Sequence, residues 1–324
     1  MTPLRLGLVG TANINTEILR AAATTSAVDV VAVGSRDALR AQAYALEHAI
    51  PRPHGSYDEL LGDEEVDAVY ISLPNGLHHE WTMQALAAGK HVLCEKPYSR
   101  RPADVEEAFD AAEAAGLVLM EAFMYRHHPQ TRRVAELVAE GAIGPLRLIR
   151  TSFSFVLRDE TNIRALPELD GGALMDVGCY CVSGARLLAG EPDRVLAEQV
   201  VGPTGIDLTL TGLLRFPGDV VAQIDCSFAL PRQQRLEAEG EDGTIVVEAP
   251  WRVDFGGAAF VRRGRAVEPI ELEDADSYRL ELENFAGAVD GREPPLLGRD
   301  DARGQARAID ALYRAAADGR GVEL

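Results

Sequence analysis

The stretch LRLGLVGTANIN, residues 4–15, joins an apolar run to a glycine and then to the start of a segment with helical spacing. Leu4–Gly10 has the length and apolar content of a buried strand, and apolar side chains recur at helical intervals over Ile14–Thr24. A strand, a glycine turn and a helix in this order are typical of a parallel sheet with helices on both faces. The stretch therefore predicts an α/β fold.

Apolar strands and amphipathic helices go on alternating as far as residue 123. Such an alternation builds right-handed βαβ units and hence one parallel sheet. The further strands are expected at Val28–Arg36, Val66–Pro74, His91–Pro97 and Leu117–Phe123, and the further helices at Leu39–His48, Leu77–Ala88 and Pro102–Ala115.

Residues 124–324 follow a different pattern, in which long strands alternate at period two. Glu241–Thr244 reads EDGT, a hairpin signal, so we expect a mainly antiparallel sheet with one covered and one open face. The predicted strand regions are Leu146–Leu157, Val195–Val201, Leu208–Phe216, Val220–Phe228, Arg235–Ala249 and Ala259–Leu272. A helix is expected at Pro129–Glu140, and helices at Leu280–Val289 and Ala302–Ala317 are candidates for packing back on the first domain.

Composition excludes several classes of function. The 324 residues are enough for two domains, and the net charge of −19 argues against a nucleic-acid partner. No apolar run approaches the length of a membrane span, and no signal peptide precedes the first strand, so a cytoplasmic protein is expected. Four cysteines lack paired metal spacing, and the adjacent His127 and His128 diverge on a helix, so no metal site is predicted.

The turn after the first strand is a candidate dinucleotide site. The pattern G-x-G-x-x-G, which lets backbone approach a pyrophosphate, falls here on Gly10, Ala12 and Asn15, so only its first position is glycine. A generic βα turn is the alternative reading. The position of the turn, between strand and helix, favours a dinucleotide-binding Rossmann domain over residues 1–123. The predicted contacts in the turn are Gly10, Thr11, Ala12, Asn13 and Ile14.

The end of the second strand bears on which dinucleotide binds. An acidic residue there holds the ribose of NAD, but the sequence reads Ser35-Arg36-Asp37, with Arg40 one helical turn further on. The planar fork of arginine suits a 2′-phosphate, so Ser35, Arg36 and Arg40 predict NADP. NAD stays possible if Asp37 faces the ribose instead.

Charged and polar residues gather at two further points. Glu95 and Lys96 end the strand HVLCEKP, and Pro97 keeps Lys96 out of helical dihedrals at the edge of the sheet where ligands bind. A solvated loop is the alternative. In GGALMDVGCY, Asp176 and Tyr180 are four residues apart and would share one face of a helix. The alternative there is an exposed carboxylate and a half-buried tyrosine.

Four motifs together resemble the Gfo/Idh/MocA oxidoreductases over essentially the whole chain. They are GLVGTANI at the first turn, LPNGLHHEW after the third strand, CEKP after the fourth, and GGALMDVGCY in the second domain. EAFMYRHHPQ and the tyrosine that closes the last motif resemble the branch that contains dimeric dihydrodiol dehydrogenase and NADP-dependent D-xylose 1-dehydrogenases.

The resemblance implies roles for individual residues. Lys96 would lie beside the nicotinamide and hold the reacting oxygen, with Glu95 orienting it and Pro97 at the family's cis-proline position. Tyr180 would exchange the substrate proton, and Asp176 would bind a substrate hydroxyl or orient the pair. Arg164 would contact the cofactor or an anionic substrate, although a surface ion pair fits it equally well. The other implied cofactor contacts are Leu73, Pro74, Asn75, His78, Glu95 and Lys96.

The sequence therefore predicts an NADP-dependent oxidoreductase acting on a carbinol of a sugar or cyclic polyol, with aldose 1-dehydrogenase as the first choice. Alternatives are a trans-dihydrodiol dehydrogenase, a 1,5-anhydrofructose-type ketosugar reductase, an enzyme that retains its cofactor, and a non-catalytic NADP-binding regulator. The open face of the second sheet, near Phe228 and Leu230, predicts a homodimer or homotetramer.

Overall fold

The computed structural model describes residues 2–271 and 273–324, which form two compact units. The first unit runs to His127 and also includes Asp276–Arg303, and the second comprises the rest. Met1 and Leu272, the last residue of one predicted strand region, lie outside the described residues. Each unit has its own sheet, and the predicted fold class is confirmed.

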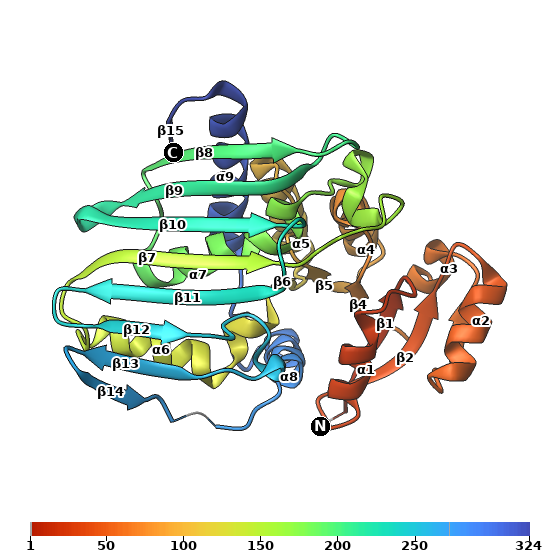
Figure 1. Ribbon diagram of the computed structural model, residues 1–324. Helices are drawn as coiled ribbons and strands as arrows, with labels where there is room; N and C mark the ends of the chain where they lie inside the picture. The colour runs from red at the N-terminus through yellow and green to blue at the C-terminus, as the bar shows by residue number, and fades with distance from the viewer. Residues whose placement is uncertain (1, 272) are drawn as a thin grey trace. The chain divides into compact units, whose positions relative to one another are not determined.

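The first unit is built on a six-stranded sheet with the order β3-β2-β1-β4-β5-β6 (Figure 1). All its neighbouring strands pair in parallel, as expected for consecutive βαβ units. The strands are β1 Leu4–Val9, β2 Val28–Gly34, β3 Arg52–His54, β4 Ala68–Ile71, β5 His91–Glu95 and β6 Leu119–Ala122. The helices are α1 Asn15–Ala22, α2 Ala38–Glu47, α3 Tyr57–Leu61, α4 His78–Ala87, α5 Pro102–Ala115 and α8 Ser277–Val289.

Helix α8 belongs to the first unit although it comes late in the sequence. Arg20 at the end of α1 pairs with Asp276, the N-cap of α8, at 2.6 Å. The Thr25 hydroxyl donates to Glu283 at 2.9 Å. These contacts hold α8 against α1.

The second unit is built on a nine-stranded sheet with the order β14-β13-β12-β11-β7-β10-β9-β8-β15. β7 and β10 pair in parallel at its centre, and the other neighbours are antiparallel. The strands are β7 Leu146–Ser154, β8 Arg194–Val201, β9 Asp207–Phe216, β10 Val220–Ser227, β11 Gln233–Gly240, β12 Thr244–Val247, β13 Ala259–Arg263, β14 Ala266–Pro269 and β15 Val322–Glu323. The helices are α6 Pro129–Ala139, α7 Cys179–Ala189 and α9 Arg299–Asp318, whose first residues belong to the first unit.

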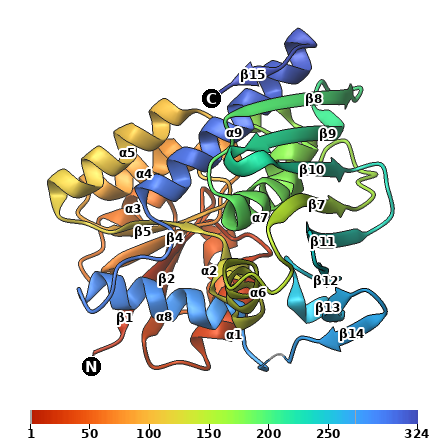
Figure 2. The same cartoon turned by 90° about the vertical axis from the view of Figure 1, so that its left-hand side faces the viewer.

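The two faces of the nine-stranded sheet differ. Figure 2 shows α6 and α7 on one side, where Ile149, Leu214 and Ile224 are buried. Within the described part of this unit, no helix covers the other face. Phe228 was expected at the open face but is only 1% exposed, because its ring packs 5.1 Å from that of Phe155.

Two structural features are absent from the described residues. No helix among them combines the length and the apolar character needed to cross a membrane. No three His, Cys, Asp or Glu side chains among them gather in an arrangement that could hold a metal ion.

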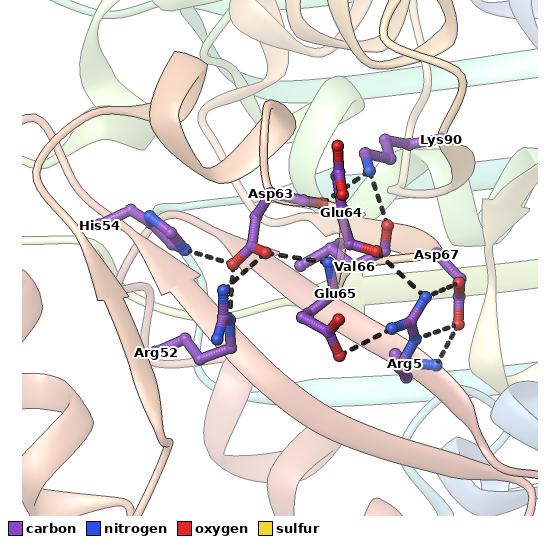
Figure 3. A network of polar contacts seen from close by, with 9 residues as sticks. All are labelled: Arg5, Arg52, His54, Asp63, Glu64, Glu65, Val66, Asp67 and Lys90. Carbon is purple, nitrogen blue, oxygen red and sulfur yellow. Dashed lines mark hydrogen bonds and ion pairs between the residues drawn. The ribbon is translucent and has the colours of Figure 1, made fainter.

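A polar network fastens the loop before β4 to β3 and to Lys90, which directly precedes β5 (Figure 3). The buried Asp63 carboxylate accepts from Arg52 Nε at 2.6 Å, lies 2.9 Å from His54 Nε2, and accepts from the Glu65 amide at 2.9 Å. Lys90 Nζ donates to the backbone oxygens of Asp63 and Val66 at 2.8 and 2.7 Å. The Arg52 guanidinium holds the pKa of Asp63 well below its usual range.

We expect Asp63→Asn to lower the free energy of unfolding at pH 7 by about 1–3 kcal/mol, because the amide cannot serve both Arg52 and His54. The pKa of Asp63 is lower in the folded state, so its contribution is present above the unfolded pKa of about 4 and lost as the pH falls. Urea unfolding at pH 7 and at about pH 3, below the unfolded pKa, should show the deficit shrinking at the lower pH. The neighbouring Glu64→Gln is the control, and an equal effect from both variants would contradict this prediction.

Candidate functional site

The turn between β1 and α1 has the geometry of an anion cradle. Gly10 has φ +107°, a conformation that favours glycine, and a side chain there would also press on Leu73 at 3.1 Å. The buried Asn15 donates from Nδ2 to the Gly10 oxygen at 2.9 Å, so an amide side chain closes the turn where the usual pattern has its last glycine.

The amides at the tip of this turn are available to a ligand. Within the described residues, the backbone N–H groups of Ala12, Asn13 and Ile14 donate no hydrogen bond. They precede α1, whose N-terminus favours negative charge. This part of the first unit therefore fits the pyrophosphate of a dinucleotide.

The end of β2 presents two arginines beside the same turn. Asp37 caps α2, because its Oδ1 accepts from the Leu39 and Arg40 amides at 2.9 and 3.3 Å, so one of its two carboxylate oxygens is held by the helix. Arg40 Nη2 reaches the Thr11 oxygen at 3.5 Å, and neither Arg36 nor Arg40 has a carboxylate partner within the described residues. These two exposed cations fit a phosphate better than a ribose hydroxyl.

The chain leaves β5 through a turn that several side chains fix. The Lys96–Pro97 peptide bond is cis, as the resemblance implied. Glu95 accepts from the Lys96 amide at 3.2 Å and also from the Tyr70 hydroxyl. The Tyr98 amide donates to the buried Glu121 at 2.8 Å. Lys96 therefore projects from a backbone that is held on both sides.

His78 lies beneath this turn and is completely buried. Its Nε2 lies 2.8 Å from the Leu73 oxygen and its Nδ1 lies 2.9 Å from the Pro97 oxygen, so the ring joins the loop after β4 to the loop after β5. Burial lowers the pKa of His78. Pro74 and Asn75, the other residues predicted in this loop, are the N-cap and the first residue of the short helix Asn75–Leu77.

In the second unit, the candidate residues Asp176 and Tyr180 lie on a π-helical turn and on the α-helix that follows it. Leu174–Gly178 forms a π-helical turn, and α7 begins at Cys179. The α-helix expected from Asp176 to Tyr180 therefore begins only at Cys179, and that the two side chains share one face stays a prediction. Such turns frequently occur at functional sites.

Tyr180 and Asp176 are held in different ways. The Tyr180 side chain is nearly buried, with ring centroids 5.5 Å from Phe153 and 6.1 Å from Trp251. The Asp176 carboxylate accepts from Arg164 Nε at 2.8 Å. Arg164, predicted to contact the cofactor or an anionic substrate, thus forms an ion pair with a second candidate residue.

Glycines allow the π-turn to approach the sheet. A side chain at Gly178 would lie 2.6 Å from Cys226 Sγ of β10, and one at Gly171 would lie 2.5 Å from the Arg164 oxygen. Gly172 has φ +127°, and its missing side chain would meet the carboxylate of Asp207. No other residue type fits these positions without a shift of the backbone or of its neighbours.

Two residues that sequence reasoning missed hold the start of the π-turn and the start of α7. The buried Asp207 accepts from the Leu174 amide at 2.7 Å and from the Tyr313 hydroxyl at 2.9 Å. Gln305 donates to the Cys179 oxygen at 2.7 Å. These partners lie far away in the sequence and form no motif with the turn, so no local signal could have found them.

Comparisons with known proteins agree with this geometry. Residues 4–123 match a family described as an oxidoreductase family with an NAD-binding Rossmann fold, and residues 131–246 match the GFO/IDH/MocA C-terminal domain. D-xylose 1-dehydrogenase (NADP(+)) 2 of Haloferax volcanii is 42% identical over 99% of this chain and 100% of its own. Trans-1,2-dihydrobenzene-1,2-diol dehydrogenase of Xenopus laevis is 36% identical over 71% of both chains.

Solved structures of oxidoreductases are also similar to this chain over almost its full length. A crystal structure of a 3-ketoreductase from Actinomadura kijaniata, in complex with NADP and TDP-benzene, has a TM-score of 0.91. It is 31% identical and covers 97% of this chain and 98% of its own. The predicted family and branch are confirmed.

We expect Gly178→Ala to destabilise the second unit by about 1–3 kcal/mol, because the new methyl group meets Cys226. Cys226→Ala removes the sulfur atom, so it should cost less in the Gly178→Ala background than in the wild type. Urea unfolding of the four proteins measures this coupling. Cys94→Ala, a buried cysteine of the first unit, is the control and should add independently; additive behaviour of Gly178 and Cys226 would contradict the packing described here.

Proposed function

The chain belongs to the Gfo/Idh/MocA oxidoreductase family, and on this premise we propose that it is an NADP-dependent dehydrogenase of sugars or cyclic polyols. An aldose oxidised at C1 is the first substrate to test. The observation that carries the proposal is the 42% identity, over almost the full length, to a protein named D-xylose 1-dehydrogenase (NADP(+)) 2. The family membership by itself is less specific about function: it makes the chain an oxidoreductase with a dinucleotide-binding domain.

The first unit supports NADP as the cofactor. The open amides after Gly10 fit the pyrophosphate, and Arg36 and Arg40 fit the 2′-phosphate through charge-assisted hydrogen bonds. Asp37, the one acidic side chain that could have favoured NAD, caps α2. When bound, the cofactor supplies the hydride acceptor, which no side chain of the chain can provide.

In the proposed reaction, the carbinol C–H bond breaks as the hydride leaves for the nicotinamide, and the O–H proton passes to the Oη of Tyr180, which enters the step as its phenolate. Lys96 Nζ donates a hydrogen bond to the reacting oxygen and stabilises negative charge on it. Asp176 accepts a hydrogen bond from a neighbouring substrate hydroxyl. The products are a carbonyl compound, a reduced cofactor and a proton that Tyr180 releases to water.

A second candidate uses the same groups in the opposite direction. The Actinomadura structure is that of a 3-ketoreductase, which favours this direction. Reduction of a ketosugar would take the proton from Tyr180 and the hydride from NADPH. Rates measured in both directions separate this candidate from an aldose dehydrogenase.

We further propose that the open face of the nine-stranded sheet joins two copies of the chain. Leu196, Val200 and Leu213 on β8 and β9 are 40%, 62% and 41% exposed on this face. Beside them, Arg150 pairs with Glu237 and Glu239. An apolar group with a charged border is typical of an interface between copies, in a dimer or a dimer of dimers.

For the activity, we expect NADP reduction with at least one member of a panel of aldoses, inositols and a trans-dihydrodiol, and slower reduction of NAD. Lys96→Ala and Tyr180→Phe should each lower kcat by about 10²–10⁴-fold, because each removes a group that acts on the reacting oxygen. Arg320→Ala, which changes an exposed residue near the end of the chain, should leave the rates unchanged. Turnover by both site variants at wild-type rates would refute the assigned roles.

For the assembly, static light scattering of the wild type at micromolar concentration should give two or four times the mass of one chain. Leu213→Asp should give a monomer, because it places an unpaired charge in the proposed interface. Leu46→Asp is the control, since Leu46 is 87% exposed on α2 and outside this face. A monomeric wild-type chain would exclude the interface.

A further inference from the structure

Hydrogen bonds of its own backbone fix the position of Arg164. It lies in the short 3-10 helix Ile163–Ala165, where its amide donates to Asn162 Oδ1 at 3.0 Å. Its carbonyl oxygen accepts from the Gly172 amide at 2.9 Å. The missing side chain of Gly171 leaves the space that this oxygen occupies. The loop thus fixes Arg164 against the start of the π-turn.

The guanidinium of Arg164 uses only part of its hydrogen-bonding capacity. Nε donates to Asp176 Oδ2 at 2.8 Å, and within the described residues the two Nη groups donate to no protein atom. The Arg164 side chain is 43% exposed, whereas that of Asp176 is 15% exposed. The Asp176 carboxylate, which can only accept hydrogen bonds, therefore lies beside the Nη groups of Arg164, which can only donate them.

We propose that Arg164 and Asp176 together recognise two neighbouring hydroxyl groups of the substrate. This inference rests on the proposed function and narrows its substrate class to vicinal diols. The Asp176 carboxylate accepts from the hydroxyl next to the reacting carbinol, and an Nη group of Arg164 donates to the oxygen of that hydroxyl or of the next one. Arg164 is thus a specificity-determining residue and has no part in the proton transfer.

A surface ion pair without function is the main competing explanation. Such pairs contribute little to stability, because their charges are solvated and their side chains lose freedom. Here, however, two hydrogen bonds fix the backbone of Arg164, and the missing side chain of Gly171 makes room for its carbonyl oxygen. The fixed position reduces the entropy lost on binding, which is what recognition of a small polar ligand requires.

The test compares a sugar with its analogue that lacks one hydroxyl. Calorimetry measures the Kd of D-glucose and of 2-deoxy-D-glucose for the NADPH-loaded protein, which holds no hydride acceptor. We expect the wild type to bind D-glucose about 10–100-fold more tightly, the range for hydrogen bonds to charged groups. Arg164→Met should reduce this preference to less than about threefold, and Arg164→Lys should restore part of it. Arg158→Met, an exposed arginine of the same loop, should leave it unchanged.

The outcomes separate this inference from the proposed function. Equal affinities for the two sugars in the wild type, or no binding of either sugar, would overturn the inference. So would an Arg164→Met protein that keeps the preference but binds NADPH more weakly, because that result makes Arg164 a cofactor contact. NADP reduction with D-glucose, D-xylose or another polyol is measured in parallel and decides the proposed function by itself.

Discussion

The close approach of the turn at residues 171–178 to strands β9 and β10 is the constraint on which the rest of the second unit depends. Gly172 and Gly178 permit it, and Asp207 holds the first amide of the π-turn from the start of β9. The wider turn places Asp176 beside Arg164, while Tyr180 follows in the first turn of α7, packed between two aromatic rings. A bulkier side chain in the turn would move these groups together, because they share one backbone.

The first unit must present positive charge to an anionic cofactor, although the chain as a whole has a net charge of −19. It does so locally, through open amides at the start of α1 and two arginines that no described carboxylate neutralises. Buried side chains keep the surrounding loops in place: Asn15 closes the first turn, and His78 joins the loops after β4 and β5. Both act through hydrogen bonds to backbone oxygens, so they shape the site through the main chain.

Most of the fold could be read from the sequence because its signals are local. Apolar runs bounded by turns gave the longer strands of both sheets, and the EDGT hairpin joins β11 to β12. β3 could not be read, because Arg52–His54 is three residues long and centred on a proline, and α3 is only five residues long. The role of Asp37 was open although Ser35–Arg40 contains a signal for it, since an aspartate before a helix is a preferred N-cap. The π-turn and its anchors Asp207 and Tyr313 escaped prediction, because a spacing of four residues fits an ordinary helix and the anchors are distant in sequence.

Direct transfer of hydrogen from a sugar carbinol to NADP is the central claim of this account. It can be tested by incubating the protein with NADP and D-xylose deuterated at C1 and examining the reduced cofactor by NMR. Direct transfer predicts one deuterium atom at C4 of the nicotinamide, and slower reduction of NADP than with the unlabelled sugar. NADPH without deuterium, or no NADPH from this sugar or any other polyol labelled at its carbinol carbon, would contradict it.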